Sequence, residues 1–437
     1  MLNVVDLFAG SGGLSLGFEL AKDKKGKNAF RLLKAVEIDP WACRTLRRNF
    51  SDEVVIEGDI RNEDTKTALE KTCKGKTDII VAGPPCQSFS LIGPRSGNSH
   101  NKKNKYKHDG LYREFIDVVE RLLPKLVVFE NVKGILSKRN GNETVINIII
   151  SELRKLGYNF KSENKDVRTE YLILNAADYG VPQTRERVFL IGNNMDIANP
   201  FPRRTHFNPL AETHHVQKSE LLPYVTLFDA IGDLPKVKPK KTMTHVPTKR
   251  KKEIETYNRR VYSGKEITEY KWKWAENHLR KTGRSGREFF GFVRPSPDIP
   301  LTHHVCRQQM ETDIKLFQGM KQGMTAKDII ESRDPETRKL AKYIRYDMNS
   351  FRDKYRKQHW RRPCSTIFAH MQKDGNRFIH PDSKQGRTFT PREAARVQSF
   401  PDDFYFEGPM TKKFQQIGNA VPPLLAKKIA ESISNIF

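Results

Sequence analysis

The sequence predicts an α/β protein with a parallel, doubly wound sheet and a second, smaller and irregular domain. Short apolar runs alternate with helical patterns over the first two hundred residues, and these runs lie at 2–8, 33–38, 54–56, 78–82, 126–129 and 188–191. Strands that are separated by helices pair in parallel, because each pair needs a crossover connection. Between about residues 200 and 300 the alternation stops, and runs of cations appear at 236–241 and 249–252. We expect the second domain there.

The end of the chain returns to patterned sequence. This pattern begins near Leu301, and an amphipathic helix is expected from about Pro423 to Ile433. At 437 residues the chain is long enough for two domains, one of which can be inserted into the other.

Charge and cysteine content narrow the class of protein. A formal net charge of +26 and a pI near 9.8 cause strong self-repulsion, which a polyanionic partner such as nucleic acid relieves. The five cysteines include no Cys-x-x-Cys pair, which argues against structural zinc and disulfides and favours a reducing, cytosolic environment. No stretch has the length and hydropathy of a membrane span, so we expect no membrane partner.

A glycine-rich loop follows the first expected strand. Residues 6–13 read DLFAGSGG, so backbone N–H groups there can approach a ligand closely. Glu37 ends the second strand and is placed to accept hydrogen bonds from ribose hydroxyls, and Asp59 follows the third. The simpler alternative is a tight turn that needs glycine for geometry alone. No Gly-Lys-Ser/Thr signature is present, which argues against nucleotide hydrolysis.

Cys86 follows the apolar run 78–82, in the segment GPPCQSFS at 83–90. The two prolines fix φ and remove N–H donors, so the strand ends and the thiol is held in a rigid loop at its carboxyl end. Open α/β sheets bind their ligands at this end of the strands. The alternative, a small buried hydrophobic side chain, is the common fate of a free cysteine.

Six segments together resemble the DNA cytosine-5 methyltransferase family, in the family's order along the chain. They are DLFAGSGG at 6–13, PPCQ at 84–87, ENV at 130–132, QTRER at 183–187, RTFTPREAAR at 387–396 and QIGNAVPP at 416–423. The resemblance covers about 1–195 and 300–437. It implies a Rossmann-like fold that depends on S-adenosylmethionine, and a target-recognition domain in the remaining segment.

The resemblance also implies the chemistry. Cys86 adds to C6 of cytosine, while Arg185 and Arg187 lower the pKa of its thiol. Glu130 hydrogen-bonds N3 and the exocyclic amine, which requires the raised pKa of a buried carboxyl. Considered alone, Glu130 could be a helix N-cap, and the two arginines could be a pair on the surface. Their expected convergence with Cys86 favours an active site.

The expected cofactor contacts lie in the glycine loop, at the ends of the next strands and in the last segment. They are Asp6, Phe8, Gly10, Gly12, Gly13, Leu14, Glu37, Ile38, Asp59, Ile60, Pro85, Asn419 and Val421. Asn419 and Val421 are expected to pack beside the glycine loop. No metal site is expected.

The expected DNA contacts fall in two groups. A loop after Cys86 that closes over the flipped-out base includes Ser88, Ser90, Arg95, Lys102, Lys103 and Lys105. Between about 208 and 300, where aromatic and basic residues are interleaved, the expected base readers are Arg280, Arg284, Arg287 and Arg294.

These expectations give three segments: a catalytic and cofactor-binding domain at 1–200, a target-recognition domain at 201–360, and a segment at 361–437 that completes the catalytic domain. The leading function is methylation of C5 in a specific duplex DNA sequence, in partnership with a restriction endonuclease. We expect a monomer in the nucleoid of a prokaryotic cytoplasm. The alternatives are a tRNA cytosine-5 methyltransferase and a DNA-binding module without activity.

Overall fold

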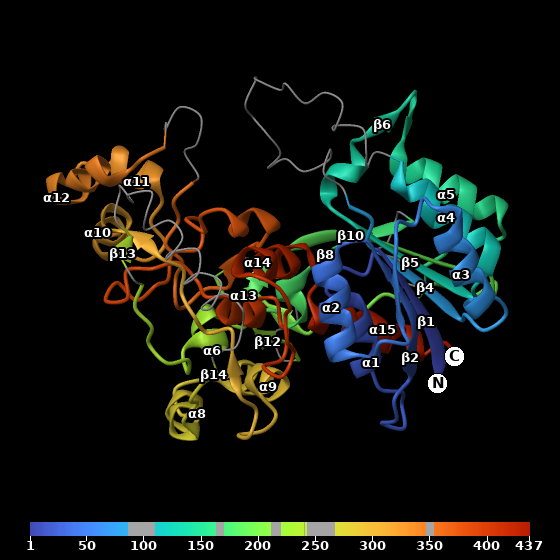
Figure 1. The fold of residues 1–437 in the computed structure, drawn as a ribbon, viewed down its shortest axis with the longest axis horizontal. Coiled ribbons are helices and arrows are strands. Elements are labelled where there is room, and N and C mark those ends of the chain that lie inside the picture. Colours follow the sequence, from blue (N-terminus) through green and yellow to red (C-terminus); the bar gives the residue numbers. More distant parts are fainter. Residues whose placement is uncertain (86–109, 163–169, 211–219, 240, 243–266, 347–353) are drawn as a thin grey trace, which may run out of the picture. The chain divides into compact units, whose positions relative to one another are not determined.

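The computed structural model describes residues 1–85, 110–162, 170–210, 220–239, 241–242, 267–346 and 354–437. The chain divides into two compact units (Figure 1). Unit 1 comprises Met1–Tyr179, Arg185–Arg204 and Ala420–Phe437, and unit 2 comprises Gly180–Thr184 and Thr205–Asn419. The expected bounds had placed the chain's return to the first domain at residue 361, whereas the compact units place it at Ala420, because residues 361–419 pack within unit 2.

Unit 1 is built on a seven-stranded sheet with the order β3-β2-β1-β4-β5-β10-β8. Its strands are β1 (Leu2–Leu7), β2 (Phe30–Glu37), β3 (Val55–Glu57), β4 (Ile79–Ala82), β5 (Leu126–Asn131), β8 (Tyr171–Asn175) and β10 (Glu186–Asn193). Six of these correspond to the six apolar runs, and the central strands among them read as continuous apolar sequence because they are buried on both faces. All four residues of β4 and all six of β5 are buried.

The first five strands pair in parallel, as predicted, but β10 runs antiparallel to both β5 and β8. The predicted parallel pairing is therefore confirmed for these five strands and wrong for β10. The reason is the connection: only the short 3₁₀ helix η3 (Ala176–Tyr179) and a few further residues separate β8 from β10, too few for a crossover.

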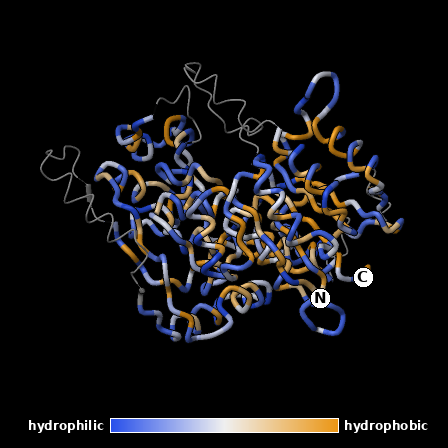
Figure 2. The backbone as a smooth tube through the Cα atoms, turned by 45° about the vertical axis from the view of Figure 1, so that its right-hand side comes forward, coloured by the Kyte–Doolittle hydropathy of each residue, from blue (hydrophilic) through white to orange (hydrophobic). Residues whose placement is uncertain are grey.

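Helices cover both faces of this sheet (Figure 1). One side carries α1 (Gly13–Leu20), α2 (Pro40–Asn49) and α15 (Pro423–Ser434), and the other carries α3 (Glu63–Cys73), α4 (Leu111–Leu122) and α5 (Val145–Lys155). The main core lies between the sheet and α3, α4 and α5; Phe115 of α4, for example, packs on Phe129 of β5 with ring centroids 5.3 Å apart. Figure 2 colours the backbone by hydropathy and shows apolar residues concentrated in the interior, with hydrophilic residues frequent in the outer loops. The remaining elements are η2 (Lys133–Leu136) and the hairpin of β6 (Arg139–Asn140) and β7 (Glu143–Thr144).

The helix α15 closes unit 1 against α1. A Cβ atom on Gly13 would lie 2.2 Å from the carbonyl oxygen of Val421, and one on Gly17 would lie 2.3 Å from the Cβ of Ala426. Only glycine permits this approach, so these two positions bring the end of the chain against its beginning. The predicted terminal helix is confirmed.

Unit 2 has short strands and helices rather than a large sheet. Its strands are β9 (Gln183–Thr184), β11 (His206–Phe207), β12 (Leu222–Pro223), β13 (Lys241–Thr242), β14 (Ile267–Thr268), β15 (Leu301–Thr302), β16 (Gln309–Met310) and β17 (Cys364–Ser365). Its helices are α6 (Leu227–Ile231), α8 (Trp272–Leu279), α9 (Arg284–Val293), α10 (Glu311–Gly319), α11 (Ala326–Ile330), α12 (Pro335–Arg338), η4 (Lys339–Tyr343), η5 (Ala369–Gln372), α13 (Pro391–Val397) and α14 (Met410–Asn419).

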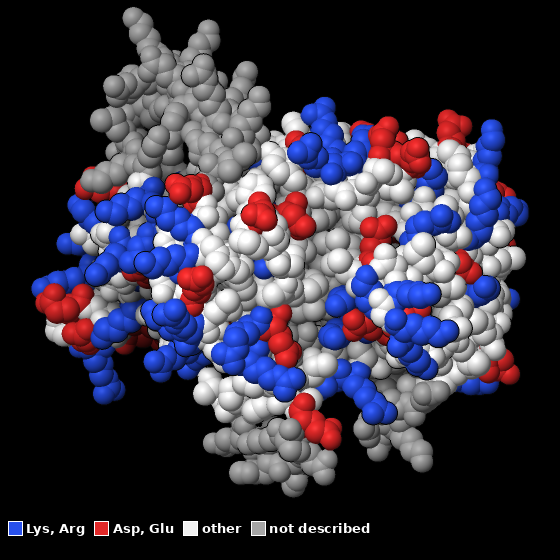
Figure 3. Space-filling view, turned by 90° about the horizontal axis from the view of Figure 1, so that it is seen from below, with Lys and Arg blue, Asp and Glu red and all other residues white. Residues whose placement is uncertain are grey.

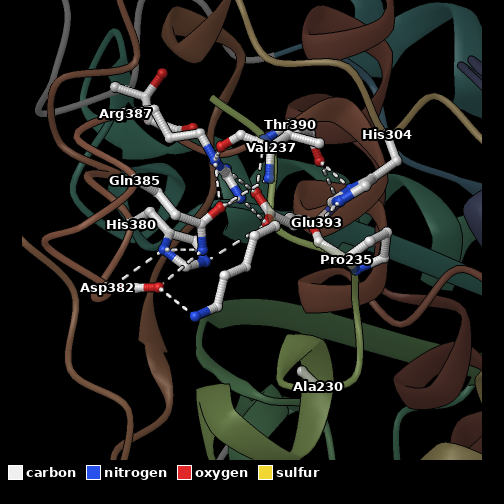
Figure 4. A network of polar contacts seen from close by, with 12 residues as sticks. Ala230, Pro235, Val237, His304, His380, Asp382, Gln385, Arg387, Thr390 and Glu393 are labelled. Carbon is white, nitrogen blue, oxygen red and sulfur yellow. Dashed lines mark hydrogen bonds and ion pairs between the residues drawn. The ribbon is translucent and has the colours of Figure 1, made fainter. Parts of the chain in front are cut away.

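Buried ion pairs hold these short elements of unit 2 together. Arg387 donates to both carboxylate oxygens of Glu393 at 2.7 Å, and also to the side chain of Gln385 and the carbonyl of Val237 (Figure 4). In a second cluster, Arg396 pairs with Asp233 and Asp402, and all three side chains are fully buried. Buried charges persist only when they are paired and hydrogen-bonded, as these are.

Within the described residues, no helix has the length and apolar character that crossing a membrane requires.

Candidate active site and cofactor site

Glu130 lies near the carboxyl end of β5, opposite Phe189 of β10. Arg187 is two residues from Phe189 on β10, and side chains two apart on a strand share one face. The Nε atom of Arg187 lies 3.1 Å from Oε1 of Glu130. Arg185, directly before β10, is 1% exposed, and Glu130 is 8% exposed. The structure thus brings together three of the four predicted catalytic residues.

Burial and the two arginines act on the Glu130 carboxyl in opposite directions. Burial raises its pKa, and the charges of Arg187 and Arg185 lower it, with a net rise above the ordinary value. Burial also lowers the pKa of Arg185 well below its usual range, with a further contribution from the charge of Arg187. A carboxyl with a raised pKa can hold a proton near neutral pH and donate it to a ring nitrogen.

The backbone that leads to Cys86 lies against this carboxyl. A Cβ atom on Gly83 would lie 3.2 Å from Oε2 of Glu130, and Nδ2 of Asn131 donates to the carbonyl of Pro84 at 3.3 Å. Sequence reasoning missed these two contacts, although both Gly83 and Asn131 stand in or beside the segments that carry the family resemblance. Pro85 is the last described residue before the predicted nucleophile, and it is exposed.

The other residues predicted in this loop, namely Cys86, Ser88, Ser90, Arg95, Lys102, Lys103 and Lys105, lie outside the described part of the chain.

The glycine loop after β1 has the backbone of a binding turn. Phe8, Gly10 and Gly12 all have positive φ, of 60°, 57° and 83°. For phenylalanine this is a strained conformation, and such strain concentrates at functional sites. Leu14 is buried in the first turn of α1, next to Gly13.

Two buried oxygen atoms near this loop have no hydrogen-bond partner in the described part of the protein. Oδ2 of Asp6 accepts from Ser15, but Oδ1 of Asp6 and the hydroxyl of Ser11 are buried without a hydrogen bond. Burial raises the pKa of Asp6 to about 7. Buried polar groups in proteins usually have hydrogen-bond partners. The two unpaired oxygen atoms therefore fit a loop that completes its hydrogen bonds with a polar ligand.

Glu37 connects the end of β2 to the glycine loop. Its Oε2 accepts from the N–H of Gly10 at 2.7 Å, and its Oε1 accepts from the N–H groups of Ile38 and Asp39 at 2.9 and 2.8 Å. Burial is the main reason that its pKa is raised. A carboxylate has about four acceptor positions, so one remains for a ribose hydroxyl.

Beside Glu37, Ile38 is 58% exposed, which leaves an apolar surface for a flat ring. Asp59 follows β3 and pairs with Arg61, whereas Ile60 is buried. These residues fit the adenosine part of S-adenosylmethionine.

Replacing Glu37 by Ala should weaken binding of S-adenosylmethionine by about 1–2 kcal/mol, because charge-assisted hydrogen bonds to the ribose are removed. Isothermal titration with the cofactor measures this change. The matched control is Glu53→Ala, which removes an exposed carboxylate outside the site. Equal loss of DNA affinity in Glu37→Ala would contradict a cofactor role and indicate a folding defect.

The two predicted cofactor residues near the end of the chain differ in their placement. The backbone of Val421 lies against Gly13, in keeping with the prediction. Asn419 is the last residue of α14 and of unit 2, and its place beside the glycine loop stays a prediction.

The four predicted base readers are placed in two different environments. Arg280 lies exposed at the end of α8, and Arg284 and Arg287 are exposed on α9, where Arg284 pairs with Glu288 at 2.8 Å. Arg294 is 1% exposed; it pairs with Asp402 at 2.7 Å and stacks over Tyr270 at 3.6 Å. Its charge is neutralised inside unit 2, which argues against contact with a base.

Comparison with known proteins identifies the family. The sequence model of the C-5 cytosine-specific DNA methylases matches residues 2–435. The chain is 33% identical to the type II methyltransferase M.DdeI of Desulfomicrobium norvegicum, over 100% of this chain and 89% of the relative. It is 30% identical to M.AgeI of Thalassovita gelatinovora, over 99% of each chain.

A solved structure has the same fold. The crystal structure of a putative DNA modification methyltransferase from an Escherichia coli prophage aligns with a TM-score of 0.64 at 24% identity, over 100% of this chain and 99% of the other. The match of the family model across almost the entire sequence establishes that the chain belongs to the C-5 cytosine-specific DNA methylases.

Proposed function

We propose that this methylase acts on one specific duplex DNA sequence, with Cys86 as nucleophile, Glu130 as acid and Arg185 and Arg187 as their positioning cations. The observation that carries the assignment is the buried contact of Glu130 with Arg187, beside Arg185 and against the backbone that leads to Cys86. The backbone that leads to Cys86, a carboxyl with a raised pKa and two cations lie where β4 and β5 end and the antiparallel strand β10 begins, and this convergence supports the proposed active site.

The proposed reaction follows from these roles. The Cys86 thiolate adds to C6 of the cytosine, and Glu130 donates a proton to N3, so that electron density moves to C5. S-adenosylmethionine, when bound, supplies an electrophilic methyl group on its sulfonium. As C5 forms its bond to that methyl group, the methyl–sulfur bond breaks and its electron pair stays on the sulfur. A base then removes the C5 proton, the C6–S bond breaks, and N3 returns its proton to Glu130, which restores the thiolate, the protonated carboxyl and the aromatic ring.

Residues near the glycine loop are proposed to hold the cofactor. Glu37 and the loop N–H groups bind the ribose and the polar end, and Ile38 covers the adenine ring. Asp59 is placed to accept from the adenine amino group, although its contact with Arg61 must then be shared.

Two finer aspects of function are also proposed. First, the enzyme acts as a monomer and protects DNA from a partner restriction endonuclease; the type II naming of its relatives supports the pairing with an endonuclease. Second, unit 2 selects the sequence, because it contains exposed arginines outside the catalytic sheet. A tRNA substrate is not favoured, since the matching family and the relatives are DNA methylases and type II methyltransferases.

Sequencing of methylated cytosines in a host without its own cytosine methylation tests this function. The parent enzyme should modify every copy of one sequence. Arg280→Gln, Arg284→Gln and Arg287→Gln should each relax that sequence at one position, since a bidentate arginine–guanine contact contributes about 1–3 kcal/mol of discrimination.

The control is Lys327→Gln, which removes an exposed charge of α11 that pairs with Glu331 close by in sequence. If all three arginine variants keep the parental sequence and reduce only overall activity, unit 2 does not select the sequence through α8 and α9. Methylation of RNA in place of DNA would contradict the function itself.

A further inference from the structure

Unit 2 contains a groove that none of the roles above uses. It has a volume of about 1040 Å³ and lies between α6, the turn from α8 to α9, the end of α10, and the segments 360–361 and 381–383. We call it the α6–α10 groove; both helices are labelled in Figure 1. Sites for small ligands reach roughly this size, which also suffices for part of a polymer.

A buried lysine fixes one side of the groove. Lys357 is 0% exposed, and its Nζ donates to the carbonyls of Phe317 and Met320 at 2.7 and 2.9 Å and to the hydroxyl of Ser383 at 2.5 Å. The first two acceptors are at the end of α10, and Met320 and Ser383 line the groove. One ammonium group with three donors thus connects the end of α10 to Ser383. The fold therefore sets the distance between these two parts of the groove wall.

Hydrogen bonds and a ring contact also hold the part of the groove wall that α6 and Trp360 form. Thr226 and Asp229 form a capping box at the start of α6, and the N–H of Phe228 donates to the carbonyl of Trp360 at 2.9 Å. The rings of Phe228 and Trp360 meet edge to face with centroids 5.9 Å apart. The groove therefore has a preformed wall with aromatic side chains.

The charge of the groove favours an anion. Lys281, Lys321 and Arg361 line it and are exposed, and within the described residues the side chain of none of them makes a hydrogen bond or a salt bridge. The lining also contains two carboxylates with partners in the protein: Asp229 accepts from Thr226, and Asp382 accepts from Lys384 and Gln385 and lies 3.9 Å from Lys236. Three cations therefore outnumber two carboxylates in the lining, which leaves it with a net positive charge. Basic side chains are also abundant on the face that Figure 3 shows.

We propose that the α6–α10 groove binds one backbone strand of the substrate duplex, with Lys281, Lys321 and Arg361 on its phosphates. DNA is the polyanion on which this enzyme acts, and phosphate contacts position a duplex without reading its sequence. Phe228 and Trp360 then pack against the apolar faces of the deoxyribose rings. The proposal depends on DNA as the substrate but not on the roles assigned to Cys86 and Glu130.

Salt-dependent DNA binding tests the proposal. The triple variant K281Q/K321Q/R361Q should bind a fluorescent duplex with the target sequence at least about tenfold more weakly at about 0.1 M salt. The slope of log K against log salt should fall by about one for each phosphate that the variant no longer neutralises, so by up to about three. The kcat at saturating DNA should stay within about twofold, because only uniform binding is removed.

The matched control is R333Q/R338Q/K373Q, which removes the same charge from exposed positions of unit 2 outside the groove. It should change the affinity less than about threefold and the slope by less than about one. Equal effects in both triple variants would overturn the proposal, since net charge alone would then explain them. An equal effect on a single strand of the same sequence would place an unpaired strand in the groove and also overturn it. If the proposed function itself is wrong, the parent enzyme will show no methyl transfer to DNA. This outcome differs from a failure of the groove proposal, in which the parent enzyme remains active.

Discussion

Cys86→Ser should lower methyl transfer to duplex DNA by at least about a thousandfold, while the affinity for DNA stays within a small factor. The hydroxyl has nearly the size of the thiol, but it is a far weaker nucleophile at neutral pH, and loss of an attacking group removes the covalent route. Transfer of a tritiated methyl group measures the rate, and fluorescence anisotropy measures the binding.

The matched control for this substitution is Cys306→Ser, which changes a half-buried thiol of unit 2. It should leave transfer close to that of the parent. A duplex with 5-fluorocytosine at the target should form an adduct that resists denaturation, because fluorine cannot leave C5 as a proton does. Turnover by Cys86→Ser at the parental rate, or mass spectra without an adduct on Cys86, would contradict the covalent mechanism.

Arg387→Met should destabilise unit 2 by about 3–5 kcal/mol, because it leaves the buried carboxylate of Glu393 without its main counter-charge. Arg387 contacts both oxygens of that carboxylate at 2.7 Å. Glu393 also accepts from the N–H of Thr390 in the capping box at the start of α13. The substitution therefore also weakens the hydrogen bonding at the N-terminus of this helix. Urea unfolding followed by circular dichroism measures the change in stability.

The pH dependence of this variant gives a second measurement. Burial raises the pKa of Glu393, but the charge and hydrogen bonds of Arg387, together with smaller contributions from His380 and His304, bring it to well below its ordinary value of 4.5. The parent therefore loses this stabilisation as the pH falls below about 4.5. In Arg387→Met burial alone dominates, so the folded-state pKa rises and stability should instead decrease as the pH rises above about 4.5.

The control for Arg387→Met is the double variant Arg387→Met/Glu393→Gln. It removes both charges and should recover most of the stability that the single variant lacks. A double variant as unstable as the single one would show that the arginine acts through packing alone.

The central strands of unit 1 could be predicted from the sequence because burial on both faces makes them continuous apolar runs. β8 was not among the expected strands, although residues 171–174 form a short apolar run; it lies at the edge of the sheet, where most of its residues are only partly buried. The direction of β10 depends on the length of the connection before it, which an apolar run does not encode.

The candidate site was predictable in its residue types but not in all its contacts. The proximity of Glu130 and Arg187 follows once β5 and β10 are known to be neighbours, but the order of strands is a tertiary property. Arg294 illustrates the opposite limit: sequence alone gives its charge, whereas its contact with Asp402 depends on a residue 108 positions away. Whether an arginine faces solvent or an internal carboxylate is decided only by such distant partners.

The close approach of Val421 to Gly13 and of α15 to Gly17 also affects the order in which the protein can mature during translation. Domains usually fold as they leave the ribosome, from the N-terminal end onward. Here unit 2 is complete at Asn419, while the first-made unit still lacks the helix that packs on its glycine loop. The inserted unit can therefore fold before the one that surrounds it in sequence, and the nascent chain gains its complete cofactor loop only after Ala420–Phe437 have emerged.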